Sequence, residues 1–490
     1  MNKKWSIILL IVAIISVIAT ISFFLSQNKK NNILSKVPNN AKSVVVIDLQ
    51  ALSTKLFFDE LTSGSKNAGK LAKLMPDSLA TIDWLASGIS LSEKAVFFTT
   101  ENIPNDSIRL HVLLRIADAK KFDNFMDSLS KTISLKPVKE KTLWSEQFKS
   151  LIAWNSNFVV FSLFSKNVGQ VAKALENILL LKKEESIMTD SSFMKKQNAG
   201  FDILFYAKPY TLYPKKQNKF IQDNIESIIS HIEFNDGELK IASELYPVTG
   251  SLLDKLFNTQ QKKIATLSVP DSSALRVALS VAPKVFFSVI NKLSSVKFNN
   301  KKAPILTAWD GRLSASLNGT KVIKTEYITY DYDDDFNKIE LKKITKDKIW
   351  DIRAVLGINE LLLDSVLDNS KIYKSKKDTL LFKGSNFIIK KTNDAYLCYN
   401  HHVSRPKIQN KTIADNIYLS LDYGKLLPII KESEFTLDNS LMSKFVFNRF
   451  ELRMNKNTLI NISASIYFSD KKKNAFFSIS EMFIKPTVDN

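Results

Sequence analysis

The first apolar pattern in the chain is a continuous run close to its start. Residues 7–25 read IILLIVAIISVIATISFFL, without a charged residue, a glycine or a proline. As a helix, this run is roughly 28 Å long at about 1.5 Å per residue, close to the thickness of the hydrocarbon core of a bilayer. The pattern predicts a transmembrane helix over 7–25, after a cytoplasmic tail over 1–6 and before a polar linker over 26–36.

Cleavage of this segment as a signal peptide is the alternative. Val17 and Ala19 offer a small-x-small pattern, although the apolar region of a signal peptide is usually about 7–15 residues long. Lysines flank the run on both sides, so the positive-inside rule is nearly balanced. Because a very short tail leads directly into the run, we expect an uncleaved single-pass anchor with the body outside the cytoplasm. No later window reaches 18 apolar residues.

After the linker, short apolar runs and amphipathic helices occur in the same order twice. The matching stretches begin at Val37 and Val269, at Asn155 and Thr392, at Asp202 and Asn416, and at His231 and Arg449. The last pair reads as alternating strands around a polar turn, which is typical of a half-buried hairpin. The pattern predicts two halves, 37–265 and 266–490, related by duplication. Chance similarity is the alternative, because strand and helix units recur in many folds.

Within the first half, single helices alternate with strands. LHVLLRIADAKKFDNFMDSL, from Leu110, passes from a strand into an amphipathic helix, and NFVVFSLFSKNVGQVAKALENILL, from Asn157, does the same with Ser165 as the expected N-cap. Strands interleaved with single helices and paired hairpins predict the α+β class. We therefore expect a transmembrane helix followed by a tandem-duplicated body of largely antiparallel sheets.

The formal net charge of +20 raises the question of an anionic partner. The chain has eight arginines against 61 lysines, spread over its whole length. Specific recognition of nucleic acid relies on the planar guanidinium group, so we expect no nucleic-acid partner. A solvated lysine-rich surface is the first interpretation, and weak attraction to anionic lipid headgroups or other envelope polyanions is the alternative.

The stretch GSKNAGKLAK, from Gly64, has the spacing of a phosphate-binding loop. Such a loop follows a buried strand and ends in Lys-Ser or Lys-Thr. Here Leu71 follows Lys70, and the preceding FFDELTS reads as the end of a helix. We expect no nucleotide at this position and no cofactor elsewhere.

Two further stretches resemble metal sites. Asp331, Asp333 and Asp335 alternate as in a calcium loop, but Phe336 and Lys342 occupy the positions where an EF-hand needs Gly and Glu. The flanking segments KTEYITY and KIELKKI alternate like strands, so the acidic run is expected to be the exposed turn of a hairpin. Adventitious calcium binding is the alternative.

Cys398, His401 and His402 lie close together in the sequence, yet a metal site needs three or four ligands. The remaining histidines, His111 and His231, have no metal-ligand spacing. The lone cysteine excludes an intramolecular disulfide, which is compatible with export. Carboxylate pairs such as Asp118/Asp123 and Asp59/Glu60 are expected on helix surfaces. The sequence thus predicts no catalytic, cofactor-binding or metal-binding residues.

Several of these motifs together resemble one family. They are VPxxA followed by VVVIDLQAL, GISLSEKAVFF from Gly88, the segment from Leu113 to Leu129, FNDGELKIASELY, and LTAWDGRLSASLNG from Leu306. The chain resembles an uncharacterised family of Bacteroidota envelope proteins, a domain of unknown function often carried as lipoproteins. The resemblance covers most of residues 37–490 and implies an envelope location without an activity. No cysteine lies near the N-terminal segment, so a transmembrane anchor would replace the lipid.

These observations lead to one expected function and two alternatives. We expect a protein anchored by one pass in a bacterial inner membrane, with its body in the periplasm and an envelope protein as its partner, acting as a non-enzymatic binding or scaffold body. The first alternative is a carrier of an apolar ligand or lipid. The second is an envelope hydrolase with an unrecognised carboxylate site.

Overall fold

In the computed structural model, the described residues form two compact units. The first consists of the described residues within 1–50 and 83–200, and the second of those within 51–82 and 201–490. The described residues are 32–55, 84–100, 109–163, 167–197, 200–208, 218–257, 265–267, 273–293, 308–332, 336–363, 372–374, 379–382, 387–392, 395–400, 408–412, 415–432 and 447–484.

The first unit is built on an antiparallel sheet. Its neighbouring strands are, in order, β1 (Ser43–Asp48), β2 (Lys94–Thr100), β3 (Arg109–Arg115), β7 (Phe158–Leu163), β6 (Ser150–Trp154), β5 (Thr142–Ser145) and β4 (Lys136–Lys139). The helices are η1 (Ile33–Lys36), η2 (Trp84–Ser87), α5 (Ala119–Thr132), α6 (Val168–Leu180), η3 (Lys183–Glu185), η4 (Ile187–Thr189) and α7 (Ser191–Gln197).

Helix α5 forms where the apolar spacing predicts it. Phe122, Met126 and Leu129 recur at helical spacing and are buried, while the Asp118 carboxylate caps the N-terminus by accepting a hydrogen bond from the Lys121 N–H at 3.0 Å. Before helix α6, the expected cap Ser165 lies outside the described residues, and Asn167 occupies the N-cap position without a side-chain hydrogen bond.

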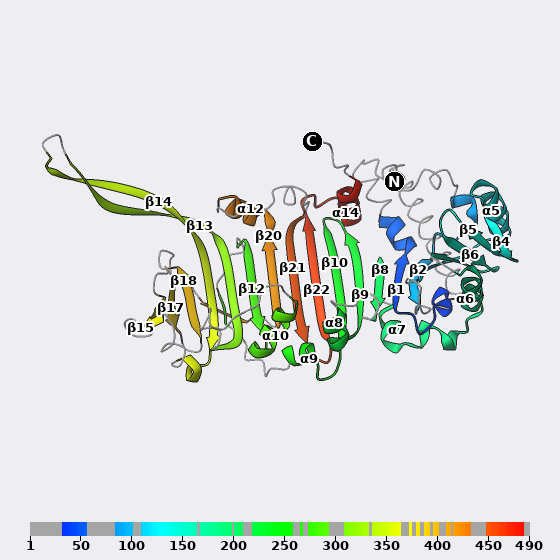
Figure 1. Cartoon of the computed structure of the whole chain (residues 1–490), viewed down its shortest axis with the longest axis horizontal. Coiled ribbons are helices and arrows are strands. Elements are labelled where there is room, and N and C mark those ends of the chain that lie inside the picture. Colours follow the sequence, from blue (N-terminus) through cyan, green and yellow to red (C-terminus); the bar gives the residue numbers. More distant parts are fainter. Residues whose placement is uncertain are drawn as a thin grey trace, which may run out of the picture. The chain divides into compact units, whose positions relative to one another are not determined.

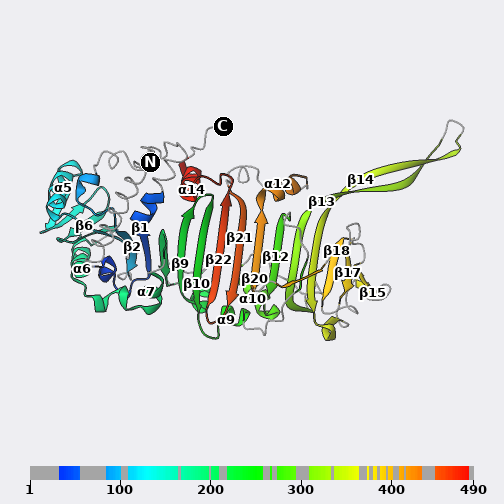
Figure 2. The same cartoon turned by 180° about the vertical axis from the view of Figure 1, so that it is seen from behind.

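The second unit is also an antiparallel sheet (Figures 1 and 2). Its order is β8 (Ile203–Ala207), β9 (Ile225–Asn235), β10 (Glu238–Pro247), β22 (Ile460–Phe468), β21 (Phe447–Lys456), β20 (Ile417–Asp422), β12 (Leu275–Ser280), β13 (Trp309–Tyr332), β14 (Lys338–Ile358), β18 (Tyr396–Asn400), β17 (Phe387–Lys391), β16 (Thr379–Phe382) and β15 (Ile372–Lys374). Strands β11 (Ala265–Leu267) and β19 (Ile408–Thr412) form a separate pair. The helices are α8 (Asn218–Asn224), α9 (Leu252–Leu256), α10 (Pro283–Leu293), α12 (Tyr423–Glu432) and α14 (Ala475–Ile484).

Helix α10 packs on the start of β13 through aromatic rings. Phe286 and Phe287 both meet the Trp309 ring edge-on, with centroids 5.6 Å and 5.8 Å away. Next to this contact, Gly311 has φ +101°, and a Cβ atom there would lie 1.9 Å from the Val281 carbonyl oxygen. A side chain at 311 would therefore separate β13 from the segment between β12 and α10.

The two predicted halves have the same strand order. In the first half, the chain forms β1-β2-β3-β7-β6-β5-β4, and in the second half it forms β12-β13-β14-β18-β17-β16-β15. Likewise, β8-β9-β10 has the order of β20-β21-β22, and β10 pairs with β22. The α+β class with largely antiparallel sheets is confirmed, and this order is the one that a duplicated chain would produce.

The compact units do not coincide with the predicted halves 37–265 and 266–490. The reason is that β8, β9 and β10 of the first half share one sheet with β20, β21 and β22 of the second half. The predicted linker also ends earlier than expected. Ile33 and Leu34 are buried within helix η1, so the body begins by Asn32, before the predicted start at Val37.

No helix in the part of the chain that the structure describes combines the length and apolar character needed to cross a membrane. The predicted transmembrane helix over 7–25 lies outside the described residues. The anchor therefore stays a prediction from the sequence.

Candidate functional site: a projecting hairpin

Among the described residues, those that the sequence suggested for chemistry do not form a common site. The Gly64–Lys70 loop and Asp59/Glu60 lie outside the described residues, as do His401 and His402. Within the described ranges, no group of three or more His, Cys, Asp or Glu side chains is arranged to hold a metal ion. Cys398 is half-buried on β18, and burial raises the pKa of its thiol to about 11. This thiol is protonated at neutral pH and is a poor nucleophile.

Asp118 and Asp123 stabilise the first unit. Asp118 caps helix α5, as described above. The Asp123 carboxylate accepts a 2.8 Å hydrogen bond from the Trp154 indole N–H and forms an ion pair with Lys141. The Trp154 hydrogen bond is the main cause that lowers the pKa of Asp123. Both carboxylates are therefore explained by local packing.

An open cavity of about 750 Å³ lies in the first unit, where the sequence suggested no site. His111 and Thr100 line it together with Leu180, Leu181 and Glu185. The His111 ring is 1 % exposed, and its Nε2 lies 3.2 Å from the Thr100 hydroxyl. The cavity can accommodate a small molecule, but its lining comes from segments far apart in the sequence, so no spacing could have indicated it.

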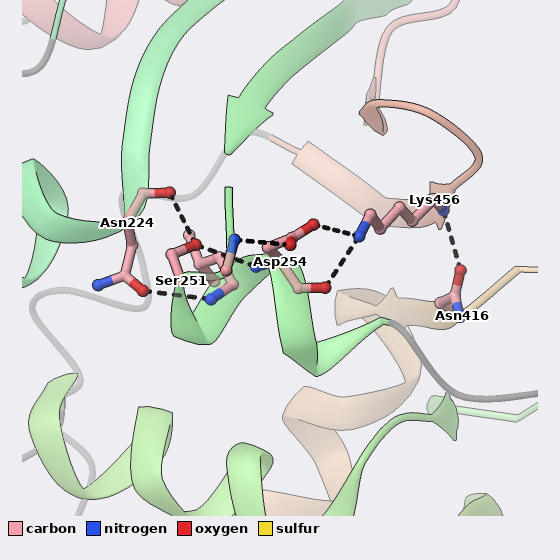
Figure 3. Close-up of polar contacts among 7 residues, drawn as sticks. Asn224, Ser251, Asp254, Asn416 and Lys456 are labelled. Carbon is pink, nitrogen blue, oxygen red and sulfur yellow. Dashed lines mark hydrogen bonds and ion pairs between the residues drawn. The ribbon is translucent and has the colours of Figure 1, made fainter. Parts of the chain in front are cut away.

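A cluster of polar side chains around Lys456 and Asp254 joins the two halves of the chain (Figure 3). The Lys456 ammonium donates to the backbone carbonyl of Asp254 at 2.9 Å and to its carboxylate at 2.5 Å. The Asp254 carboxylate also accepts from the Gly250 N–H at 2.9 Å. These two interactions, with Lys456 the larger, lower the pKa of Asp254. The Lys456 side chain is only 8 % exposed and that of Asp254 is 20 % exposed.

The same cluster fixes the strand ends around it. Ser251 caps α9, and its hydroxyl accepts from the Asp254 N–H at 3.2 Å. The Asn416 side chain accepts from the Lys456 N–H at 2.9 Å and donates to the Ser280 carbonyl at 3.1 Å. Asp202 lies before β8 as Asn416 lies before β20. Its carboxylate accepts a hydrogen bond from the Phe234 N–H at 2.6 Å, as the Asn416 side chain does from the Lys456 N–H. This cluster is a structural junction, because its polar groups bind one another.

A corresponding contact links the last helix of the second half to a strand of the first half. Asn474, just before α14 of the second half, donates to the Phe234 carbonyl of the first half at 3.0 Å. The Phe234 and Phe476 rings meet edge-on at 5.4 Å. Each half therefore places its last helix on the hairpin of the other half.

The two strands predicted on either side of the acidic run are confirmed, and they are far longer than the alternation indicated, whereas Asp333 and Asp335 of the turn lie outside the described residues. Strands β13 and β14 pair from Trp309↔Ile358 to Tyr332↔Lys338. Strand β12 covers β13 only up to Leu317, and β18 covers β14 only from Arg353 onward. Beyond these points, among the described strands, β13 and β14 pair only with each other (Figure 1). The stretch of β13 from Asn318 to Tyr332 is about 50 Å long at about 3.3 Å per residue.

The equivalent hairpin of the first half is short. Strands β2 and β3 hold the positions of β13 and β14 in the shared order, and each has 7 residues. By contrast, β13 has 24 residues and β14 has 21. Strands β1 and β7 flank β2 and β3 along nearly their whole length. Within the described residues, β2 and β3 therefore extend hardly beyond their neighbours, whereas β13 and β14 extend far beyond theirs.

One face of the hairpin carries lysines among apolar side chains. Residues opposite each other in the register share a face, and so do residues two apart on a strand. The lysine face, as we call it, consists of Lys324, Lys338, Lys342, Lys346 and Lys348, with Val322, Ile328, Tyr330, Tyr332, Ile344 and Trp350, and with Glu326 and Glu340. Its apolar side chains, except Trp350, are 50–65 % exposed.

The opposite face of the hairpin differs in its net charge and in the exposure of its apolar side chains. We call it the threonine face, and it consists of Thr325, Thr329 and Thr345, with Ile323, Tyr327, Ile339, Leu341 and Ile349, and with Lys321, Asp331, Lys343 and Asp347. Its charges balance, and its most exposed apolar side chains reach only 39–42 %. The lysine face is therefore the more exposed and the more basic of the two.

The comparisons with known proteins identify no family. No family model matches this chain, and no curated protein matches it. Among solved structures, crystal form IV of TP0453 is similar with a TM-score of 0.30 and 10 % identity, over 43 % of this chain and 79 % of that one. Crystal form III gives a TM-score of 0.29 and 9 % identity, over 45 % and 82 %. At these TM-scores the likeness supports no conclusion about this chain.

Proposed function

We propose that this protein is a non-enzymatic binding or scaffold protein of the bacterial cell envelope, held in the inner membrane by residues 7–25, and that the hairpin β13–β14 is its docking element. The envelope location and the anchor rest on the apolar run and on the family resemblance. The docking role rests on the structure of the second unit.

The observation that carries the docking role is the free-standing part of the hairpin. It exposes Ile328, Tyr330 and Tyr332 on one face, while the equivalent strands β2 and β3 are paired with β1 and β7 along nearly their whole described length. Exposed apolar surface of this kind on a soluble body marks an interaction site. The extension pairs with no other described strand of the sheet and leaves apolar side chains in contact with water, which is unfavourable. A partner that covers these side chains would explain it.

Photo-crosslinking in cells tests this role. A photoreactive amino acid would replace Tyr330 on the hairpin and, as a control, Leu91 in the first unit, whose side chain is also exposed. We expect adducts at Tyr330, read by mass spectrometry so that protein and lipid adducts are both detected, and few at Leu91. Equal yields at the two positions would contradict the docking role.

A further inference from the structure

We propose that the lysine face of the hairpin binds the anionic surface of a phospholipid bilayer. This inference rests on the proposed docking role of the hairpin and names its partner. It follows from the charges on this face, from the side chains between them and from the shape of the hairpin.

The lysines are placed as an anion site requires. Lys324 and Lys346 lie directly opposite each other in the register, and Lys348 is their diagonal neighbour on the same face. Like charges directly opposite each other destabilise a pair of strands. Among the described residues, no carboxylate forms an ion pair with Lys324, Lys342 or Lys346. A phosphate group between these ammonium groups would remove the repulsion.

The apolar side chains between the lysines suit the interface of a bilayer. Tyr330 and Tyr332 lie near the tip of the hairpin and Trp350 near its base, and Tyr and Trp favour the depth of the headgroups. The lysine stems can cover apolar surface while their ammonium groups reach the phosphates. The Lys338 ammonium already lies 3.7 Å from the centre of the Tyr330 ring.

Two glutamates oppose anion binding on this face, but each has lysines beside it. Glu340 lies between Lys338 and Lys342 on its own strand, and Glu326 lies two residues from Lys324. Five lysines therefore outweigh two glutamates along the whole length of the hairpin. A net charge of +20 also disfavours a second copy of this chain as the partner.

The shape of the face favours a bilayer over an acidic protein. The lysine face is one side of a narrow two-stranded ribbon, and its lysines follow one another from base to tip. The headgroups of a bilayer are mobile, so they can adapt to lysines that follow one another along a twisted ribbon. The threonine face, with balanced charges and better covered apolar side chains, would then point to water.

Binding to vesicles tests the proposal with the full chain. The protein would be placed in nanodiscs of phosphatidylcholine, so that any anchor is already occupied, and mixed with vesicles of phosphatidylcholine or of phosphatidylcholine with one-third phosphatidylglycerol. We expect binding to the anionic vesicles only, weakening as salt rises. The triple variant K324E/K342E/K346E should bind at least about 100-fold more weakly, because each lysine near an anionic surface increases the affinity about fivefold and three lysines are lost.

The matched control reverses three exposed lysines away from the hairpin, K120E/K173E/K471E. It has the same net charge as the hairpin variant, and we expect its binding to stay within about threefold of the original chain. Equal losses for the two triple variants would show that only the net charge of the chain acts, and they would overturn the proposal. Binding that is the same with and without phosphatidylglycerol would also overturn it. Circular dichroism establishes that both variants are folded.

The outcome separates this inference from the docking role. If K324E/K342E/K346E lost vesicle binding yet kept its adducts at position 330 in cells, the hairpin would dock on something else, and the lipid proposal would be wrong while the docking role stood. If position 330 gave no adducts in the original chain, the docking role itself would be wrong.

Discussion

Lys456 is the residue on which the contact between the two halves depends most directly. It contributes to sheet pairing through its backbone and to the neighbouring helix through its ammonium group, which lies within hydrogen-bond distance of two oxygens of Asp254. These partners are separated by 202 residues in the sequence. Removing Lys456 leaves the partly buried Asp254 carboxylate with the Gly250 N–H but without its charged partner.

We therefore expect Lys456→Met to lower the free energy of unfolding by about 1–3 kcal/mol, the usual cost of a partly buried polar group that loses its partner. Urea unfolding followed by circular dichroism measures the change. Lys472→Met, at an exposed lysine in the turn between β22 and α14, is the control and should alter stability by less than about 0.5 kcal/mol. Equal effects would show that the junction contributes nothing specific.

The same pair predicts a dependence on pH. The Lys456 hydrogen bond, followed by that of the Gly250 N–H, lowers the pKa of Asp254. A carboxyl with a lower pKa in the folded state stabilises the fold above its ordinary pKa of about 3.9, and this stabilisation is lost as pH falls through the folded value. The difference in stability between the original chain and Lys456→Met should therefore shrink below about pH 4. A difference that stayed constant in acid would exclude the ion pair as its source.

Cys398 gives a prediction of reactivity. Burial on β18 raises the pKa of its thiol to about 11, and thiol reagents attack the thiolate. At pH 8 the folded protein should react with a disulfide reagent about 100-fold more slowly than the protein in guanidinium chloride, where the pKa returns to about 8.5. Similar rates in the two conditions would mean that the thiol is accessible in the folded state.

At the scale of elements, the base and the projecting part of the hairpin have different roles. The base of β13 holds the core contact of Trp309 with Phe286 and Phe287. From residue 322 outward, the hairpin pairs only with itself and its side chains are largely exposed. Stability should therefore depend on the base and hardly on the projecting part.

Replacing residues 322–348 by Asn-Gly, which suits a two-residue turn between Lys321 and Ile349, tests this difference. We expect the thermal midpoint to stay within about 3 °C of that of the original chain, because no other described strand pairs with the removed part and its side chains are largely exposed. Trp309→Ala is the contrasting variant and should cost about 3–5 kcal/mol. A large loss of stability on shortening the hairpin would show that it packs on the body.

For single elements, the sequence was informative where the periodicity was long. Helix α5 follows from the spacing of Phe122, Met126 and Leu129, and the paired strands beside Asp331 follow from their alternation. Helix η1 was assigned to a linker, because its four residues are too few to show a period. The free edges of the hairpin could not be predicted, since alternation indicates a strand but does not say where its neighbours end.

At the scale of the whole molecule, the two halves share their core. One apolar cluster contains Phe234 and Leu239 of the first half with Phe468 and Ala475 of the second. Strands β10 and β22 pair from Glu238↔Tyr467 to Leu245↔Ile460. Neither half can bury these faces by itself, so the halves should fold as one cooperative structure.

A protease site inserted between residues 258 and 264 tests this cooperativity. After cleavage, we expect both fragments to elute together in gel filtration without denaturant and to separate in urea. The reason is that the pairing of β10 with β22, the Lys456–Asp254 contact and the Asn474–Phe234 contact all remain. The original chain without the inserted protease site, treated with the same protease, is the control. Fragments that separated without denaturant would show that each half is stable alone.

The sequence by itself determined the properties that depend on local pattern: a segment apolar enough to span a bilayer, the α+β class, the repeated order of strands and helices, and a hairpin around Asp331. Only the tertiary structure decided the properties that depend on neighbours. It pairs β10 with β22 and joins Lys456 to Asp254. It also leaves β13 after Leu317 and β14 before Arg353 paired, within the described part of the chain, only with each other. The physical reason is that alternation fixes the face on which a side chain lies, whereas partners and exposure depend on segments brought together from distant parts of the chain.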